Sequence, residues 1–245
     1  KKIDALESLV FRAREEGADL TADRYPYIAA NTELFSILPD SVMDGGEARA
    51  LERLGDAGER TRIAEAFREQ RTGIEWNRIL ISRAAFDANE FESATMADVA
   101  MTLRADPVEA LFEVLRRGRL KVSAIFFDMC EENLERILRW PFVCIGSDSS
   151  ARALTGPTAE GKPHPRAFGT CARFLGEYVR ERRLMPLPEA VHRLTGLPAQ
   201  RFRLVDRGVL RPGAFADVTV FAPETVRDRA TYEDPFQLSE GIRHL

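Results

Sequence analysis

A strand–helix–strand pattern near the middle of the chain constrains the fold more than any other feature. Residues 122–127 form a mostly apolar run that predicts a strand, residues 131–139 predict a short helix, and residues 141–146 predict a second apolar strand. This order indicates a βαβ unit, in which the two strands pair in parallel and are buried on both faces. The sequence therefore predicts an α/β fold.

Chemistry is expected at the carboxyl ends of these strands, because ligands of parallel sheets and barrels bind there. Asp128 follows the first strand and Ser147-Asp148 follows the second. Asp128 is more typical of a turn. Asp148 opens an aperiodic stretch, residues 148–169, and loops of that length are uncommon unless they are functional or disordered. Asp148 is thus either a catalytic carboxylate or the cap of the next turn, and its position favours catalysis.

The rest of the chain carries clear helix and strand signals. Thr95 with Asp98 is similar to a capping box, and Asp106-Pro107 is a typical helix start. The remaining expectations are helices over 3–13, 47–54, 59–71, 169–183 and 188–195, strands over 18–23 and 79–82, and a hairpin over 208–221 around Pro212-Gly213.

Composition excludes several classes of function. Lys and Arg number 35 against 39 Asp and Glu, a net charge of −4, and no basic run indicates a nucleic-acid or membrane surface. No apolar stretch approaches the roughly 18 residues of a membrane span. Cys130, Cys144 and Cys171 are too scattered for a disulfide framework, so we expect buried, inert thiols and a cytoplasmic protein. The three His have no ligand spacing, which excludes a complete histidine-rich metal centre within the chain.

Several motifs occur in order from about residue 17 to residue 242. They are Tyr25-Pro26-Tyr27 with Asn31-Thr32, residues 144–148 ending in Gly146-Ser147-Asp148, residues 162–170 beginning Lys162-Pro163-His164-Pro165-Arg166, residues 194–199, and the closing segments 207–217 and 228–232. Together these motifs resemble the D-aminoacylases, which are N-acyl-D-amino-acid deacylases of the amidohydrolase superfamily.

The resemblance implies the C-terminal portion of a metal-dependent-hydrolase (β/α)₈ barrel plus part of a small β-sandwich. Residues 1–205 would be the later part of the barrel, with a helical insertion around residues 31–105, and residues 206–245 would supply strands of the sandwich. The chain opens on Lys1-Lys2 within a helix pattern, without Met. We therefore expect the 245 residues to be a fragment of a longer protein.

The resemblance also implies the reaction, which is zinc-dependent hydrolysis of N-acyl-D-amino acids to a carboxylate and a D-amino acid. Asp148 would act as general base on the metal-bound water and then pass the proton to the departing amine. The family's zinc ligands, a His-x-His pair followed by a Cys and two further His, would lie upstream of Lys1. We therefore expect the chain alone to be inactive.

Substrate-binding positions follow from the same motifs. Tyr25, Tyr27, Asn31 and Thr32 would line the pocket, although they could equally be core residues under a loop. His164 and Arg166 would lie at its mouth, with Arg166 or Lys162 meeting an anionic group, although His164 could equally clamp the loop. The partner would be a small N-acyl amino acid, with no nucleic acid or membrane. A homodimer is possible, because the edges of an unclosed sheet tend to associate.

Two alternatives to this function stay open. One is a cyclic-amide hydrolase of hydantoinase or dihydroorotase type on the same scaffold. The other is an inactive fragment that binds through its surface.

Overall fold

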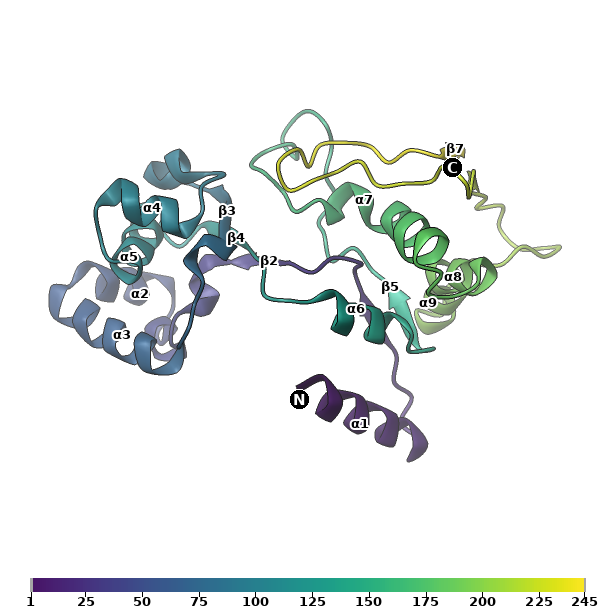
Figure 1. The fold of residues 1–245 in the computed structure, drawn as a ribbon, viewed down its shortest axis with the longest axis horizontal. Helices are drawn as coiled ribbons and strands as arrows, with labels where there is room; N and C mark the ends of the chain where they lie inside the picture. The colour runs from purple at the N-terminus through teal and green to yellow at the C-terminus, as the bar shows by residue number, and fades with distance from the viewer. Residues whose placement is uncertain (1, 245) are drawn as a thin grey trace. The chain divides into compact units, whose positions relative to one another are not determined.

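The computed structural model describes residues 2–244 and divides into two compact units (Figure 1). Unit 1 consists of the chain up to Ile28, Met129–Leu154 and the chain from Pro165 onward. Unit 2 consists of Ala29–Asp128 and Thr155–His164. Unit 2 is therefore inserted twice into the sequence of unit 1. Among the described residues, no helix is long and apolar enough to cross a membrane.

Unit 1 contains a pair of parallel strands and several helices. Its elements in chain order are α1 (Lys2–Glu15), β1 (Ala22–Arg24), α6 (Glu131–Leu138), β5 (Val143–Ile145), α7 (Arg166–Arg173), the π-helix η5 (Phe174–Glu181), α8 (Leu187–Leu194), α9 (Gly196–Arg201), β6 (Val220–Phe221) and β7 (Ile242–His244). β1 pairs in parallel with β5, with Asp23 opposite Cys144. β6 pairs antiparallel with β7.

Two apolar clusters hold these elements of unit 1 together. One joins α6 to the continuous helix formed by α7 and η5, and its largest members are Phe174 and Tyr178. The other surrounds the start of β5, where the ring of Phe11 from α1 lies 5.9 Å from that of Trp140 and 5.3 Å from that of Phe142. Both clusters flank β5, so packing fixes a strand that is only three residues long.

Unit 2 is an antiparallel sheet with helices. Its elements are β2 (Ala30–Glu33), the 3₁₀ turns η1 (Leu34–Ile37) and η2 (Asp40–Met43), α2 (Glu47–Gly55), α3 (Ala57–Gln70), η3 (Trp76–Arg78), β3 (Ile79–Ala84), η4 (Phe86–Phe91), α4 (Met96–Leu103), α5 (Pro107–Arg117) and β4 (Val122–Phe126). The strand order is β2-β4-β3, and both pairings are antiparallel.

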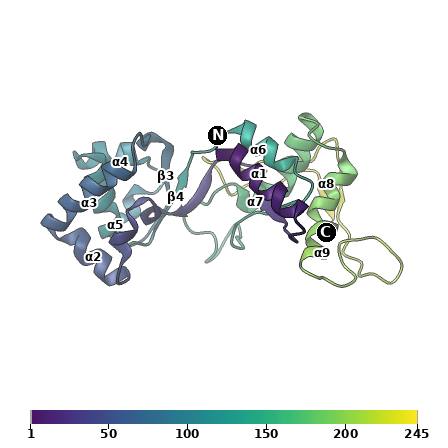
Figure 2. The same cartoon turned by 90° about the horizontal axis from the view of Figure 1, so that it is seen from below.

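The centre of unit 2 is α5, which contacts α2, α3 and α4 (Figure 2). Its first turn is built as expected, since Asp106 accepts a hydrogen bond from the backbone N–H of Val108 at 3.0 Å and Pro107 is the first helical residue. Leu111, Phe112 and Leu115 of α5 are fully buried against the sheet and the other helices. An amphipathic helix at the centre gives unit 2 a core of its own.

The expected pairing of residues 122–127 with residues 141–146 is wrong. β4 pairs antiparallel with β2 and β3 in unit 2, whereas β5 pairs in parallel with β1 in unit 1. An apolar run indicates that a strand is buried, but it does not indicate which strand lies beside it. The βαβ unit does exist, as β1-α6-β5, with most of unit 2 inserted between β1 and α6.

The expected hairpin over residues 208–221 is also corrected. The turn forms, because Ala214 N–H donates to Arg211 O at 3.1 Å and Gly213 has a φ of +84°. The ladder does not form, and β6 begins only at Val220 and pairs with β7. The alternating apolar side chains of this segment stay exposed, Leu210 by 82%, so no buried face stabilises a hairpin.

Two smaller expectations also change. Cys144 is buried as expected, but Cys130 and Cys171 are exposed, because Cys130 precedes α6 as its N-cap and Cys171 faces a cavity beside α7. The helix expected over residues 169–183 begins at Arg166. The aperiodic stretch therefore ends about one helical turn earlier than the sequence predicts.

The helix start of α4 gives a stability prediction. Asp98 N–H donates to Thr95 Oγ1 at 3.2 Å, and Thr95 N–H donates to Asp98 Oδ2 at 3.1 Å, which completes a capping box. We expect Thr95→Ala to lower the free energy of unfolding by about 1 kcal/mol, because it leaves a helix-end donor without its partner. Urea denaturation followed by circular dichroism measures the loss.

The matched control is Thr102→Ala in the same helix. The exposed hydroxyl of Thr102 only donates back to Asp98 O at 2.9 Å, so the stability of this variant should not fall. Hydrogen bonds from Thr95 hold the pKa of Asp98 below its ordinary value of 3.8. The effect of Thr95→Ala should therefore be full above that value and shrink as the pH falls through the lowered pKa. Equal stability of the two variants at neutral pH would contradict the capping role.

Candidate functional site

The carboxyl ends of β1 and β5 carry the first group of candidate residues. Parallel strands end at the same edge of a sheet, and here Gly146 N–H donates to Arg24 O at 3.3 Å, one residue beyond the paired strands. Tyr25-Pro26-Tyr27 follows β1, and Ser147-Asp148 follows β5. The sheet thus brings together two motifs that are more than a hundred residues apart in the sequence.

Asp148 lies in a constrained backbone conformation with an accessible carboxylate. Its φ is +47°, in the left-handed region that Asp tolerates better than most residues. Its side chain is 64% exposed, and its Oδ2 forms an ion pair with Nη2 of Arg166 at 3.0 Å. The structure therefore presents an exposed, charged acceptor at a fixed strand end.

Arg166 is buried, with only 6% of its side chain exposed. It is the first residue of α7, and its guanidinium carbon lies 4.6 Å from the centre of the Tyr25 ring. The Arg24 guanidinium lies 4.3 Å from the same ring. A buried guanidinium needs an anion and an aromatic face to offset its lost hydration, and Asp148 and Tyr25 supply these.

Tyr27 is anchored by a half-buried carboxylate, that of Asp228. Its hydroxyl donates to Oδ2 of Asp228 at 2.6 Å, and Ala230 N–H donates to Oδ1 of the same residue at 2.8 Å. Burial, together with the Asp228 charge, raises the pKa of the Tyr27 hydroxyl far above its ordinary value. Burial also raises the pKa of Asp228, and that of nearby Tyr232 to about 12. Both tyrosine hydroxyls are therefore neutral at physiological pH.

Arg173 fixes the same segment from α7. Its guanidinium carbon lies 4.9 Å from the centre of the Tyr27 ring, and its Nε donates to Pro26 O at 2.8 Å. Its Nη2 pairs with Glu177 at 2.8 Å. The Tyr25-Pro26-Tyr27 segment is thus held at a side-chain hydroxyl, an aromatic face and a backbone carbonyl.

The other sequence-predicted site residues lie in unit 2. Asn31 and Thr32 are on β2, where Asn31 Oδ1 accepts from Ser82 Oγ at 2.8 Å and Thr32 is exposed. His164 is buried, and its Nε2 lies 3.1 Å from Ala29 O, to which it can donate a hydrogen bond. That bond matches the loop-clamp alternative for His164. Direct contact of these three residues with a substrate stays a prediction.

The structure therefore groups Asp148, Arg166, Tyr25 and Tyr27 within unit 1. The sequence did not point to Asp228 or Arg173 as parts of this group. Asp228 stands in one of the closing motifs, which were recognised only as a pattern, and Arg173 is one of several charged residues on its helix. Their membership of the group is visible only in the structure, because Asp228 and Tyr27 are 201 positions apart in the sequence.

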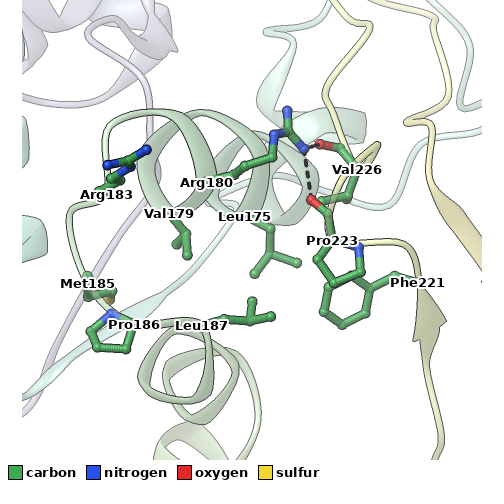
Figure 3. Close-up of a pocket in the computed structure, with 10 residues that line it drawn as sticks. All are labelled: Leu175, Val179, Arg180, Arg183, Met185, Pro186, Leu187, Phe221, Pro223 and Val226. Carbon is green, nitrogen blue, oxygen red and sulfur yellow. Dashed lines mark hydrogen bonds between the residues drawn. The ribbon is translucent and has the colours of Figure 1, made fainter.

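Among the described residues of unit 1, a pair of cavities borders the helix formed by α7 and η5. One, of about 610 Å³, borders Ser147 and Arg166 of the group and is otherwise lined mainly by apolar residues such as Phe168 and Leu175. The other, of about 450 Å³, contains no residue of the group (Figure 3). Arg180 closes one of its sides by donating to Pro223 O at 3.1 Å and Val226 O at 2.6 Å. Of these two cavities, the one of about 610 Å³ borders the candidate site and the other does not.

No metal centre can be built from residues 2–244. No three His, Cys, Asp or Glu side chains of that range come close enough to hold an ion. The described donor set therefore does not fit a zinc ion, and we derive no chemical step of this chain through a metal.

Comparison with known proteins identifies similar chains. The model of the amidohydrolase family matches residues 49–244. The N-acyl-D-glutamate deacylase of Alcaligenes xylosoxydans xylosoxydans is 33% identical over 234 residues, which are 96% of this chain and 38% of that protein. The D-aminoacylase of the same organism is 46% identical over 123 residues, which are 50% of this chain and 24% of that protein.

Solved structures give the same picture. The N-acyl-D-glutamate deacylase of Bordetella bronchiseptica, complexed with zinc and a phosphonate mimic of the tetrahedral intermediate, has a TM-score of 0.73 and 34% identity, and the match covers 98% of this chain and 41% of that chain. A crystal structure of D-aminoacylase has a TM-score of 0.69 and 31% identity, with coverage of 97% and 40%. The chain thus spans about two fifths of these relatives.

The fit between α7 and Asp228 can be tested directly. A Cβ at position 169 would overlap the Asp228 carboxylate, so only glycine leaves room for it. We expect Gly169→Ala to displace Asp228 from Tyr27 and to lower the free energy of unfolding by about 1–3 kcal/mol. Gly55→Ala, which has open space around its added methyl group near the end of α2, should be neutral or slightly stabilising. Equal thermal stability of both variants would contradict the described packing.

Proposed function

Because the chain belongs to the amidohydrolase family, we propose that it is part of an enzyme that hydrolyses N-acyl-D-amino acids to a carboxylate and a D-amino acid. The similar proteins named above, which are deacylases of N-acyl-D-glutamate and D-aminoacylase, support this substrate class. The observation that carries the proposal is the accessible Asp148 carboxylate at a parallel strand end, which forms an ion pair with the buried Arg166.

We propose that unit 1 is the later part of a (β/α)₈ barrel. Its β1-α6-β5 sequence is one strand–helix–strand step of such a barrel, with unit 2 as an insertion, and β6 and β7 would belong to the small β-sandwich. Among the described residues, β1 and β5 pair with no third strand. Further strands of a longer protein, or a second copy of the chain, would cover those edges.

In this proposal Asp148 handles the proton. Its carboxylate accepts a proton from the attacking water and later delivers it to the amine nitrogen as the C–N bond breaks. The exposed position of the side chain gives both groups access to it. Zinc would be the cofactor of the whole enzyme, with ligands outside the described part of this chain.

Arg166 would bind the carboxylate of the amino-acid part of the substrate, with Tyr25 and Tyr27 beside it. The planar guanidinium can hold a carboxylate through two parallel hydrogen bonds, and its position over the Tyr25 ring limits where they form. Asn31, Thr32 and His164 are further proposed pocket positions, with His164 acting through the loop that it holds.

Asp148→Asn in the full-length enzyme tests the proton-transfer role. We expect kcat to fall by about 10²–10⁴-fold with N-acetyl-D-amino acids, because the amide cannot accept the proton, while zinc content and circular dichroism stay unchanged. Asp128→Asn, at the exposed end of β4, is the control and should keep full activity. Unchanged turnover in Asp148→Asn would refute the role, and faster hydrolysis of hydantoins than of linear amides would favour the cyclic-amide alternative.

Arg166→Lys tests the anion-binding role. Lysine keeps the charge but loses the planar fork and the stack on Tyr25, so KM for N-acetyl-D-amino acids should rise about tenfold or more. KM for the corresponding C-terminal amides, which have no carboxylate, should change little. Arg139→Lys, an exposed control on the C-cap of α6, should leave both values unchanged. An equal rise with acids and amides would show that Arg166 does not read the carboxylate.

A further inference from the structure

Asp228 is a half-buried residue whose carboxylate touches two separate elements of the candidate site. One is the Tyr25-Pro26-Tyr27 segment, whose Tyr27 hydroxyl donates to Asp228 Oδ2 at 2.6 Å. The other is α7, where the missing side chain of Gly169 leaves room for the carboxylate. Gly169 lies three residues after Arg166, so Asp228 packs one helical turn from the buried arginine.

The Tyr25-Pro26-Tyr27 segment has little freedom once this contact is made. Arg24 Nη2 donates to Tyr27 O at 3.0 Å, and Arg173 Nε donates to Pro26 O at 2.8 Å. With the hydroxyl of Tyr27 fixed by Asp228, both ends of that residue are held. The Tyr25 ring, two residues earlier, then takes a defined position opposite Arg166.

Both oxygens of Asp228 are used. Oδ2 accepts from Tyr27 and Oδ1 accepts from Ala230 N–H, so the two carboxylate oxygens match two donors at once. An asparagine at this position has one acceptor oxygen, and its NH₂ group would face one of those donors. A donor facing a donor in this half-buried position would disturb the local geometry.

We propose that Asp228 is a positioning residue, which fixes the Tyr25-Pro26-Tyr27 segment against α7 and thereby sets the stack of Arg166 on Tyr25. The orientation of the Arg166 guanidinium decides how it meets Asp148 and the substrate carboxylate. Asp228 would therefore tune anion binding without touching the substrate. This inference rests on the proposed function, because it takes Arg166 as the anion-binding group.

Kinetics of Asp228→Asn in the full-length enzyme test the proposal. We expect KM for N-acetyl-D-amino acids to rise about tenfold while kcat changes less than threefold, and KM for the corresponding amides to stay the same. Tyr27→Phe, which removes the donor but keeps the ring, should shift KM in the same direction. Asp234→Asn, six residues away with an exposed side chain that accepts from Gln237, is the matched control and should match the wild type.

The double variant Asp228→Asn/Arg166→Lys separates positioning from a general loss of stability. If Asp228 acts through Arg166, the second substitution should raise KM no further than Arg166→Lys alone. Additive effects, an equal loss with the amide substrates, or unchanged kinetics in Asp228→Asn would each overturn the proposal.

A spectroscopic measurement distinguishes failure of this inference from failure of the proposed function. In ¹⁵N-arginine-labelled protein, the Nε–H signal of Arg166, assigned by its loss in Arg166→Lys, carries a ring-current shift from Tyr25. We expect that shift to decrease in Asp228→Asn and Tyr27→Phe, but not in Asp234→Asn. An unmoved signal would overturn the positioning role alone. A wild-type enzyme with no deacylase activity would overturn the proposed function, while the signal would still report on the stack.

Discussion

The parallel pairing of β1 with β5 is the constraint on which the candidate site depends. It pairs Ala22 with Val143, although most of the unit 2 sequence lies between these two residues in the chain. It also places the two strand ends that carry the motifs at one edge of the sheet. Three residue pairs alone could not stabilise such a non-local contact. Its support comes from the aromatic cluster before β5 and from the buried Arg193, whose Nη1 donates to Trp140 O at 2.8 Å. The geometry of the site therefore depends on the packing around this short sheet.

Buried charge is the second organising feature of unit 1. The buried Arg166 and the half-buried Asp228 would each be costly to desolvate alone, and each is matched by an opposite charge or a hydrogen-bond donor and by an aromatic ring. Arg173 extends the arrangement by contacting the Tyr27 ring and a backbone carbonyl. Such networks specify one geometry, because removing any member leaves a buried polar group unsatisfied. A single geometry is what the proposed function requires, because Arg166 must be oriented toward the carboxylate that it binds.

Local features of this fold could be predicted from the sequence, and non-local ones could not. The starts of α4 and α5 depend on hydrogen bonds within a few residues, so Thr95 and Asp106 identified them. Asp148 was placed correctly at a strand end, because that requires only the strand before it. The predicted partner of that strand was wrong, because an apolar sequence indicates burial but not which strand lies beside it. Asp228 was missed, because its role depends on a tyrosine 201 positions away.

The insertion of unit 2 shows why the site can remain in unit 1. The longer excursion leaves and re-enters at neighbouring points, where Met129 N–H donates to Ile28 O at 3.3 Å. The shorter excursion, Thr155–His164, lies between Asp148 and Arg166, so their ion pair ties its two stems together. Closing a long loop costs little more than closing a short one, and unit 2 has its own core. The ion pair of the candidate site therefore also joins the two points at which the chain leaves and re-enters unit 1.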